Sequence, residues 1–485
     1  MIRGIFVSSC LRGMFTVFAI TAISAQQPPD RARPPQPGPP AELRLPAIQK
    51  RKLSNGLPVW IVELHKVPVA QVNLVAFSGT ANDPPGKYGL ASLTSALLEE
   101  GAAGRSALEI ADAVDYLGAD LAATTTSDAA AVRLHVPVAR LADAMAIMAD
   151  VALRPTFPND ELERQRQQRL TSILQARDDP PTIAANAFSR ILYGKGHRYG
   201  TPQLGTAETI KTFTVDDLRA FYTSMFRPDN STLLVVGDIT ADRALPIVEK
   251  NFGAWKPAGE AHAEKLPEVE RPSGRRLFLI DKPGAPQSQI RIGTIGVPRS
   301  TPDYFPLVVM NTILGGSFTS RLNNNLREVH GYTYGASSNF DMRLGAGPFV
   351  AAAGVQTDKT AEALKEFFNE LNGILKPVPP DELARAKNYV SLRYPSAFET
   401  TADISRRLED ALVYHLPDDY FSKYVQNVQA VAGADVQRVA QKYVQPDRLA
   451  VVVVGDLQSI ETGVRALNLG PVTVMTIDEV FGPKP

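Results

Sequence analysis

The stretch FRPDNSTLLVVGDIT, residues 226–240, returns in altered form as VQPDRLAVVVVGDLQ, residues 444–458. Both stretches contain a Pro-Asp pair, a run of leucine and valine typical of a buried strand, and a closing Gly-Asp pair. Three pairs of matching residues lie 218 positions apart (446 − 228, 455 − 237 and 289 − 71): Pro228 and Pro446, Gly237 and Gly455, Gln71 and Gln289. A period this long excludes a solenoid, whose repeats have roughly 20 to 50 residues. The sequence therefore predicts one domain that has been duplicated.

Each copy is expected to be α+β, with a mostly antiparallel sheet and helices packed on it. In the first copy, strands are predicted over 57–64, after an Asn55-Gly56 turn, and over 69–77. Helical patterns cover 141–153 and 159–177. The predicted organisation is a first domain, a polar linker rich in Pro and Gly, a second domain and a tail: 48–256, 257–273, 274–470 and 471–485. Whether the tail docks on the second domain or hangs free is left open.

The first 25 residues predict a secretory signal peptide. Arg3 and Arg12 accompany an apolar run over 14–23, and Ser24 and Ala25 supply small residues for cleavage. The run is too short to span a bilayer, so no stable membrane insertion is expected. A lipid anchor at Cys10 is the weaker alternative. The stretch 7–10 loosely resembles a lipoprotein cleavage box, but only six residues precede it and they contain no apolar run. Because the signal peptide resembles those of bacteria, we expect the protein to be located in the periplasm.

The mature protein is expected to begin with a proline-rich linker over 26–47, extended and without a core. It would contain no cysteine, because the single cysteine lies in the signal peptide, so no disulfide holds it. The 51 basic residues equal the 51 acidic ones. This balance argues against a nucleic-acid partner, which calls for a basic surplus or patch.

Five stretches, taken together in order and spacing, resemble the insulinase/pitrilysin family of inverted-motif zinc peptidases (peptidase family M16). The resemblance covers about residues 48–470 and rests on NGLPVWIVELHKVPVAQVNLVAFSGT, GKYGLASLTSALLEEG, RPDNSTLLVVGDIT, LREVHGYTYGASS and VVVVGD. It implies two homologous half-domains arranged as half of a clamshell. Active members carry His-x-x-Glu-His on the helix that matches 86–101. There the two histidines bind zinc, and the Glu acts as general base on the bound water.

The zinc motif is lost in this sequence. In register with it, Ser92 and Ala96 stand at the two histidines and Ser95 stands at the Glu. The third family ligand, a Glu on a later helix, falls near Thr171 and Ser172. Serine and alanine are poor zinc ligands, and a serine lacks the pKa of a suitable base. The sequence therefore predicts that this chain binds no zinc.

No replacement metal site is predicted elsewhere. None of the six histidines lies near another histidine or begins a His-x-x-Glu pattern. Glu99 and Glu100 follow the motif positions by one turn and are expected to form a solvated helix end before Gly101.

The second copy keeps a different pair of family residues. LREVHGYTYGASS places Arg327 at a helix end, Gly331 as a helix breaker, and Tyr334 at the start of an extended segment. The resemblance implies that Arg327 hydrogen-bonds a substrate carbonyl and that Tyr334 places its hydroxyl near the tetrahedral oxyanion. Tyr332 is a near neighbour, but the seven-residue spacing favours Tyr334. The preceding stretch, 313–328, is either a flexible substrate-side segment or a plain surface loop.

Three functions are considered. The first is the non-zinc subunit of an exported heterodimeric peptidase, whose homologous partner carries His-x-x-Glu-His and the zinc, acting on extended peptides. The second is a catalytically inactive scaffold or peptide-binding protein with a peptidase fold. The third, an independent hydrolase, is disfavoured because the sequence has no Gly-x-Ser-x-Gly elbow and no Ser/His/Asp or Cys/His arrangement.

Overall fold

We analysed the protein in a computed structural model, which describes residues 38, 45–258 and 266–485. The predicted signal peptide and most of the proline-rich linker lie outside the described residues, as do 259–265 of the predicted inter-domain linker. The described residues from 45 onward belong to one compact unit. Within the described part of the chain, no helix combines the length and the apolar character that a membrane crossing requires.

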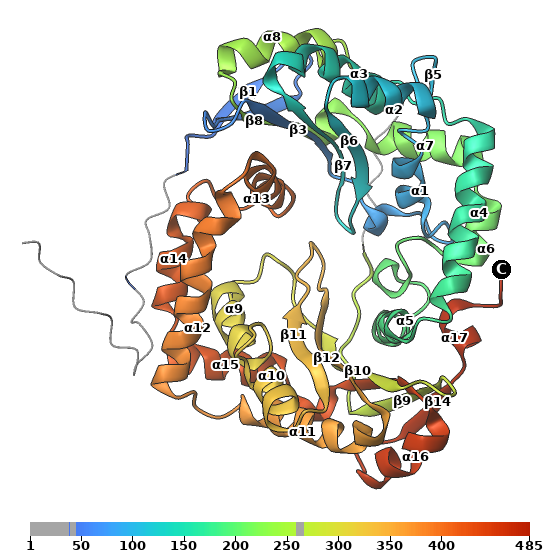
Figure 1. Ribbon diagram of the computed structural model, residues 1–485, viewed down its shortest axis with the longest axis vertical. Helices are drawn as coiled ribbons and strands as arrows, with labels where there is room; N and C mark the ends of the chain where they lie inside the picture. Colours follow the sequence, from blue (N-terminus) through green and yellow to red (C-terminus); the bar gives the residue numbers. More distant parts are fainter. Residues whose placement is uncertain (1–37, 39–44, 259–265) are drawn as a thin grey trace, which may run out of the picture. The chain divides into compact units, whose positions relative to one another are not determined.

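Two six-stranded sheets form the framework of this unit (Figure 1). The strand order is β1-β2-β8-β3-β7-β6 in the first sheet and β11-β12-β10-β13-β9-β14 in the second. The first sheet comprises β1 (Gln49–Lys52), β2 (Pro58–Glu63), β3 (Val69–Ala76), β6 (Asp120–Thr125), β7 (Ala130–Pro137) and β8 (Ser231–Gly237). The second comprises β9 (Arg276–Asp281), β10 (Gln287–Ile295), β11 (Thr333–Phe340), β12 (Pro348–Gln356), β13 (Ala450–Gly455) and β14 (Val472–Met475). A separate two-stranded ribbon pairs β4 (Gly101–Ala102) with β5 (Arg105–Ser106).

The duplication read from the sequence is visible strand by strand. The order β2-β8-β3-β7-β6 in the first sheet corresponds to β9-β13-β10-β12-β11 in the second. Gln71 and Gln289 lie on the equivalent strands β3 and β10, while Gly237 and Gly455 end the equivalent strands β8 and β13. The pairs β2–β8 and β9–β13 are parallel, whereas the remaining pairs of these matched strands are antiparallel. The predicted α+β class with mostly antiparallel sheets is confirmed.

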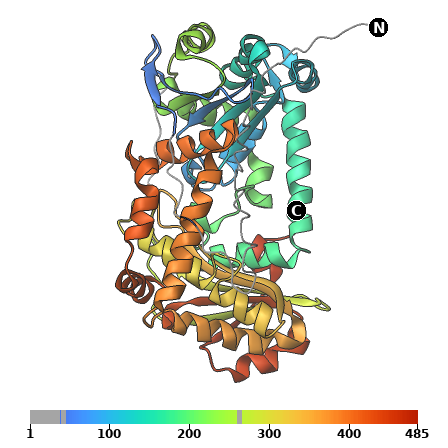
Figure 2. The same ribbon diagram turned by 60° about the vertical axis from the view of Figure 1, so that its left-hand side comes forward.

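The sixth strand has a different origin in each sheet. In the first sheet it is β1, which pairs antiparallel with β2, whereas in the second it is β14, which pairs parallel with β9. The C-terminal tail therefore docks on the second sheet. After β14 the chain forms α17 (Ile477–Phe481), which lies beside α5 in both views (Figures 1 and 2). The buried Arg177 guanidinium pairs with Asp478 and donates to the Gly482 carbonyl at 2.7 Å.

Helices cover both faces of each sheet. They are α1 (Leu90–Ala96), α2 (Ala107–Tyr116), α3 (Leu141–Leu153), α4 (Asn159–Ala176), α5 (Pro180–Tyr193), α6 (Ala207–Thr212), α7 (Val215–Met225), α8 (Ala241–Phe252), α9 (Tyr304–Leu314), α10 (Arg321–Asn323), α11 (Thr360–Gly373), α12 (Pro380–Arg393), α13 (Thr401–Val413), α14 (Tyr420–Ala430), α15 (Gly433–Tyr443) and α16 (Leu457–Ala466). A π-helical turn, η5 (Asn324–Val329), continues α10. One large core joins the first sheet to α1–α4 and α6–α8, and a second joins the other sheet to α9, α11, α12 and α14–α16.

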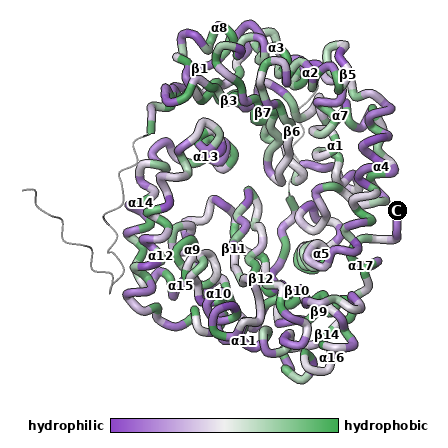
Figure 3. The backbone as a smooth tube through the Cα atoms, in the orientation of Figure 1, coloured by the Kyte–Doolittle hydropathy of each residue, from purple (hydrophilic) through white to green (hydrophobic). Residues whose placement is uncertain are grey.

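The two halves exchange one helix each, which covers the other face of the opposite sheet (Figure 1). Helix α5, from the first half of the sequence, buries Ile183, Ala187 and Phe188 against β10 and β13. Helix α13, from the second half, buries Ile404 and Leu408 against β3 and β8. The two helices start 221 positions apart (401 − 180), close to the repeat distance. Figure 3 shows the apolar character of α5, which the buried position requires.

Candidate functional site

Helix α1 begins at a glycine that no other residue could replace without strain. Gly89 has φ +95°, and a Cβ there would meet the backbone of Leu204 and Gly205. The buried Asp83 carboxylate accepts hydrogen bonds at 2.7 Å from the amides of Gly89 and Ala91, which satisfies the first turn of the helix. Burial raises the pKa of Asp83 to about 7. The helix is thus fixed at its start.

The first position of the lost zinc motif, Ser92, is held by two neighbours. Its hydroxyl donates to the Gln203 carbonyl at 2.6 Å and accepts from Nη1 of Arg169 on α4 at 2.8 Å. Arg169 is buried, and burial lowers its pKa to about 10, so it remains a cation at neutral pH. A positive charge therefore lies against the helix face where the family motif would hold a metal.

The other positions of the lost motif also offer no free metal ligand in the described structure. Ser95 is buried, and its hydroxyl accepts a hydrogen bond from the Thr125 hydroxyl on β6. Ala96 offers no ligand atom. Thr171 and Ser172 return their hydroxyls to their own helix, donating to carbonyls one turn back at 2.9 and 3.0 Å. On α4 it is Arg169, not these two residues, that contacts the α1 face.

These side chains do not fit the zinc ion that the family resemblance implies. Zinc in proteins is bound by thiolate, imidazole or carboxylate ligands, and the α1 face offers a serine, a second serine and an alanine beside a guanidinium. Across the described ranges, 45–258 and 266–485, no group of three or more His, Cys, Asp or Glu side chains could hold a metal. Helix α1 therefore offers no set of zinc ligands.

The expectation that Glu99 and Glu100 form a solvated helix end is wrong. The Glu99 carboxylate accepts the amide of Ala123 on the edge strand β6, and burial raises its pKa. Glu100 pairs with Arg164 and accepts from the Gln165 amide at 2.7 Å. Both carboxylates have partners, because Glu99 lies against β6 and Glu100 lies against α4.

Arg327 lies on η5, the π-helical turn before β11. Its guanidinium carbon is 4.6 Å from the centre of the Phe318 ring, and its nearest carboxylate is that of the adjacent Glu328, at 3.5 Å. Gly331, with φ +66°, ends the turn and lets the chain enter β11. The predicted helix end and breaker are both where the sequence placed them.

Tyr334, at the start of β11, is the most exposed of the large hydrophobic side chains in the described residues, at 90%. It makes no side-chain hydrogen bond within the described part of the chain. A register irregularity between Thr333 and Ala336 turns this end of β11 out of the regular ladder. Tyr332, by contrast, packs against the core and stacks on His330 at 4.9 Å. The structure thus brings Arg327 and Tyr334 to one end of β11, with both side chains accessible.

The Arg327–Tyr334 end and the α1 face belong to different sheets (Figure 1). No hydrogen bond or ion pair in the described ranges joins them. Arg327 and Tyr334 therefore make no hydrogen bond or ion pair with Ser92, Ser95 or Ala96 in the described structure.

The outer edge of β11 is closed over its middle. Asn323 accepts the amide of Ala336 at 3.2 Å, the Gly315 carbonyl accepts the amide of Ser338 at 3.1 Å, and Asn311 donates to the Ser338 carbonyl at 3.0 Å. A Cβ on Gly315 would lie 2.2 Å from the Ser338 nitrogen, so glycine is needed for this contact. The Gly315-Gly316 segment therefore packs against the strand and seals its edge.

The comparisons with known proteins agree with this architecture. Residues 59–206 match the profile of insulinase (peptidase family M16), and residues 212–390 match that of the peptidase M16 inactive domain. The chain is 26% identical over 356 residues to the uncharacterized zinc protease YmxG of Bacillus subtilis, covering 73% of this chain and 85% of that protein. It is 24% identical over 416 residues to an uncharacterized zinc protease of Streptomyces coelicolor, covering 85% and 90%.

Solved structures with the same fold include a peptidase M16 inactive domain from Pseudomonas fluorescens, with a TM-score of 0.78 and 29% identity over 84% of this chain and 98% of that one. A protease from Helicobacter pylori has a TM-score of 0.77 and 23% identity, covering 84% of this chain and 100% of that one. Two family profiles and the duplicated sheets point the same way: this chain belongs to the insulinase family, peptidase family M16.

Proposed function

We propose that this chain is the non-zinc subunit of an exported, heteromeric zinc peptidase of the periplasm. It binds extended peptides and contributes Arg327 and Tyr334 to the zinc site of a homologous partner that carries His-x-x-Glu-His. The chain itself holds no zinc, which the Arg169 guanidinium against Ser92 supports.

One observation carries the proposal: Tyr334 is 90% exposed and free of hydrogen bonds in the described structure. An exposed tyrosine without packing partners contributes little to the stability of the fold, whereas the buried Tyr193 donates its hydroxyl to the Ala346 carbonyl. Its neighbour Arg327 is held in place by Phe318 yet keeps most of its donors unused. Two accessible hydrogen-bond donors at the end of one strand fit a role toward an external ligand.

The chemistry follows from the donors. The partner's zinc site would supply the activated water for hydrolysis. In this chain, the planar Arg327 guanidinium directs N–H groups to a substrate carbonyl, which orients the peptide. The Tyr334 hydroxyl donates a hydrogen bond to the oxygen that becomes negatively charged in the transition state.

The test is co-purification of the chain from the periplasm, followed by peptide hydrolysis with the partner. We expect a stoichiometric partner with His-x-x-Glu-His, identified by mass spectrometry. In the reconstituted pair, Tyr334→Phe should lower kcat/KM about 100-fold, the usual loss for one oxyanion donor. Arg327→Ala should lower it by about the same factor, because the substrate carbonyl is no longer oriented. Tyr116→Phe is the matched control, because Tyr116 is 81% exposed but lies on α2.

Two results would contradict the proposal. Retained activity in both site variants would remove the role of the pair. A chain that co-purifies with no peptidase subunit would instead support the alternative, an inactive scaffold or peptide-binding protein with a peptidase fold.

A further inference from the structure

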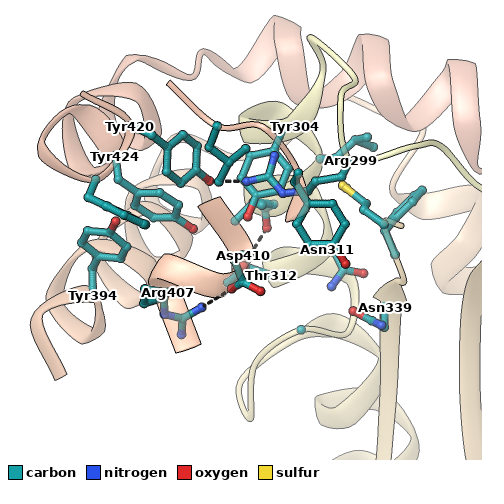
Figure 4. Close-up of a pocket in the computed structure, with 18 residues that line it drawn as sticks. Arg299, Tyr304, Asn311, Thr312, Asn339, Tyr394, Arg407, Asp410, Tyr420 and Tyr424 are labelled. Atoms are coloured by element: carbon teal, nitrogen blue, oxygen red, sulfur yellow. Dashed lines mark hydrogen bonds and ion pairs between the residues drawn. The ribbon is translucent and has the colours of Figure 1, made fainter. Parts of the chain in front are cut away.

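A pocket of about 440 Å³ lies between α9, α13, α14 and the far end of β11 (Figure 4). Asn311 and Asn339 lie at one side of it, and tyrosines from α9, η7 (Tyr394–Phe398) and α14 form the other. A volume of this size is in the range of ligand-binding pockets. Because α13 is the exchanged helix, the pocket exists only where the two halves interlock.

The tyrosine wall supplies hydroxyl donors. Tyr394 and Tyr424 stack in parallel with ring centres 4.0 Å apart, and Tyr420 lies edge-on to Tyr424 at 5.8 Å. Burial raises the pKa of all three phenols, so they stay protonated at neutral pH. The Tyr394 hydroxyl is buried and has no hydrogen-bond partner among the described residues. A buried hydroxyl without a partner is costly unless a ligand or water satisfies it.

Arg299 supplies a fixed cation at the pocket wall. Its guanidinium carbon is 3.6 Å from the centre of the Tyr304 ring, and Nη2 donates to the Tyr420 hydroxyl at 2.6 Å. No carboxylate of the described residues lies within 4.0 Å of it. A guanidinium has five N–H donors in one plane, so most of those of Arg299 have no acceptor among the described residues. The cation is therefore oriented by tyrosines and has no carboxylate in direct contact, although the Asp410 carboxylate interacts with it at longer range.

The charges that line the pocket sum to a positive value. Arg299 and Arg407 contribute two cations, and Asp410 contributes the one carboxylate. Arg407 reaches Asp410 only at 3.4 Å, and burial raises the pKa of Asp410. The donors thus exceed the acceptors, which favours an anionic ligand with planar acceptor geometry.

We propose that this pocket binds a peptide carboxylate, held by Arg299 and the tyrosine hydroxyls. The carboxylate belongs to a peptide C-terminus or to an acidic side chain. The inference rests on the proposed function in one respect, that peptides are the ligands of this chain. Asn339, at the pocket, follows Tyr334 by five residues along β11. At about 3.4 Å per residue, this places Asn339, at the wall of the pocket, roughly 17 Å along the strand from Tyr334.

The position explains how a peptide is held although β11 has a closed edge. With Asn311, Gly315 and Asn323 on that edge, a peptide gains no ladder of backbone hydrogen bonds over 336–338. An ionic anchor about five residues away fixes the register of the peptide instead.

The test measures peptide binding to the full chain alone, by calorimetry, without a partner subunit. The probes are an acetylated heptapeptide of alanine and leucine with a free C-terminus, its C-terminal amide, and two amides with an internal glutamate or glutamine. We expect the free acid, the glutamate peptide, or both, to bind at least about tenfold more tightly than the neutral peptides. Which of the two binds tells a C-terminus from an acidic side chain.

Variants of the pocket residues test which charged side chain holds the carboxylate. Arg299→Gln should weaken carboxylate binding about 10- to 100-fold and leave the neutral peptides unchanged. Asp410→Asn should keep or tighten it, since a like charge is removed. Tyr420→Phe, which frees the Arg299 guanidinium, should weaken it by a smaller factor. Arg276→Gln is the matched control, because Arg276 is exposed and stacks on Phe278 outside the pocket.

Equal binding of acidic and neutral peptides would overturn the proposal, as would no binding at all. Loss of binding in Asp410→Asn with retention in Arg299→Gln would show that Arg299 does not hold the carboxylate and would also overturn the proposal. Circular dichroism verifies that each variant is folded. Failure of the proposed function is separate, because hydrolysis with a partner depends on Arg327 and Tyr334 and is not measured here.

Discussion

The exchanged helix α13 is anchored by one buried carboxylate, and removing it gives a sharp prediction. Glu409 Oε1 accepts from Asn73 Nδ2 at 2.6 Å and from Arg133 Nε at 2.9 Å, while Oε2 accepts from Arg133 Nη2 at 2.6 Å. Asn73 is itself fixed by Gln71, whose amide donates to it at 2.6 Å. Glu409→Ala leaves the Arg133 and Asn73 donors unpaired against the face of the first sheet.

The magnitude follows from burial. Breaking a buried ion pair by removing one partner costs about 3 to 5 kcal/mol. The Glu409 side chain is 11% exposed, but that of Arg133 is 31% exposed, so water recovers part of the loss. We therefore expect Glu409→Ala to lower the free energy of unfolding by about 2 to 3 kcal/mol.

The assay is urea unfolding of the full chain, followed by circular dichroism. Arg406→Ala is the control on the same helix, exposed and expected to change stability by no more than about 0.5 kcal/mol. In a double-mutant cycle, Glu409→Ala should cost less in an Arg133→Ala background, because the pair is already broken. A loss below about 1 kcal/mol, or an equal loss in both backgrounds, would refute this reasoning.

Three further predictions concern the β11 edge, the C-terminal tail and a buried carboxyl. Gly315→Ala should destabilise the chain by about 2 kcal/mol in thermal unfolding, because its Cβ would lie 2.2 Å from the Ser338 nitrogen. Gly274→Ala has open space around it and should be neutral, and equal melting temperatures of the two variants would contradict the sealed edge. Deleting 471–485 should lower the free energy of unfolding by about 3 kcal/mol or more in the same assay, because it uncovers α5 and removes Val480 and Phe481 from the core. A loss no larger than that caused by deleting only 483–485 would contradict this prediction. The pKa of Asp83 is raised from 3.8 to about 7, so between these pH values the native state keeps a proton that the unfolded chain has released. This group therefore lowers the free energy of unfolding by about 1.4 kcal/mol per pH unit as the pH rises from 4 to 7, with no further change above pH 7. Asp83→Asn should flatten this slope, measured from urea unfolding, and an unchanged slope would contradict the role of Asp83.

The family and the duplication could be predicted from the sequence because both are local patterns repeated at a fixed distance. Pro228 and Pro446 mark equivalent turns, and the strands that follow them are fully buried and equivalent. The break at Gly331 and the start of the strand before Tyr334 also follow from residue type. Periodicity and backbone preference act over a few residues, so a sequence displays them directly.

Contacts between distant segments were decided only by the tertiary structure. Arg169 against Ser92, Glu99 on the edge of β6, and Arg299 beside Tyr420 each join residues from different elements. Nothing in the spacing of these residues distinguishes them from surface arginines or glutamates.

From the sequence alone, we could assign the matching strands of the two copies, several helices, and the loss of the zinc motif on α1. Which sheet each helix covers became known from the fold, in which α5 packs on the second sheet and α13 packs on the first. Their exchange brings α13 to α9 and β11, and with it the pocket of Arg299 and Asp410. Local preference fixes the element, whereas burial of its apolar face fixes its partner, and that partner can lie hundreds of residues away.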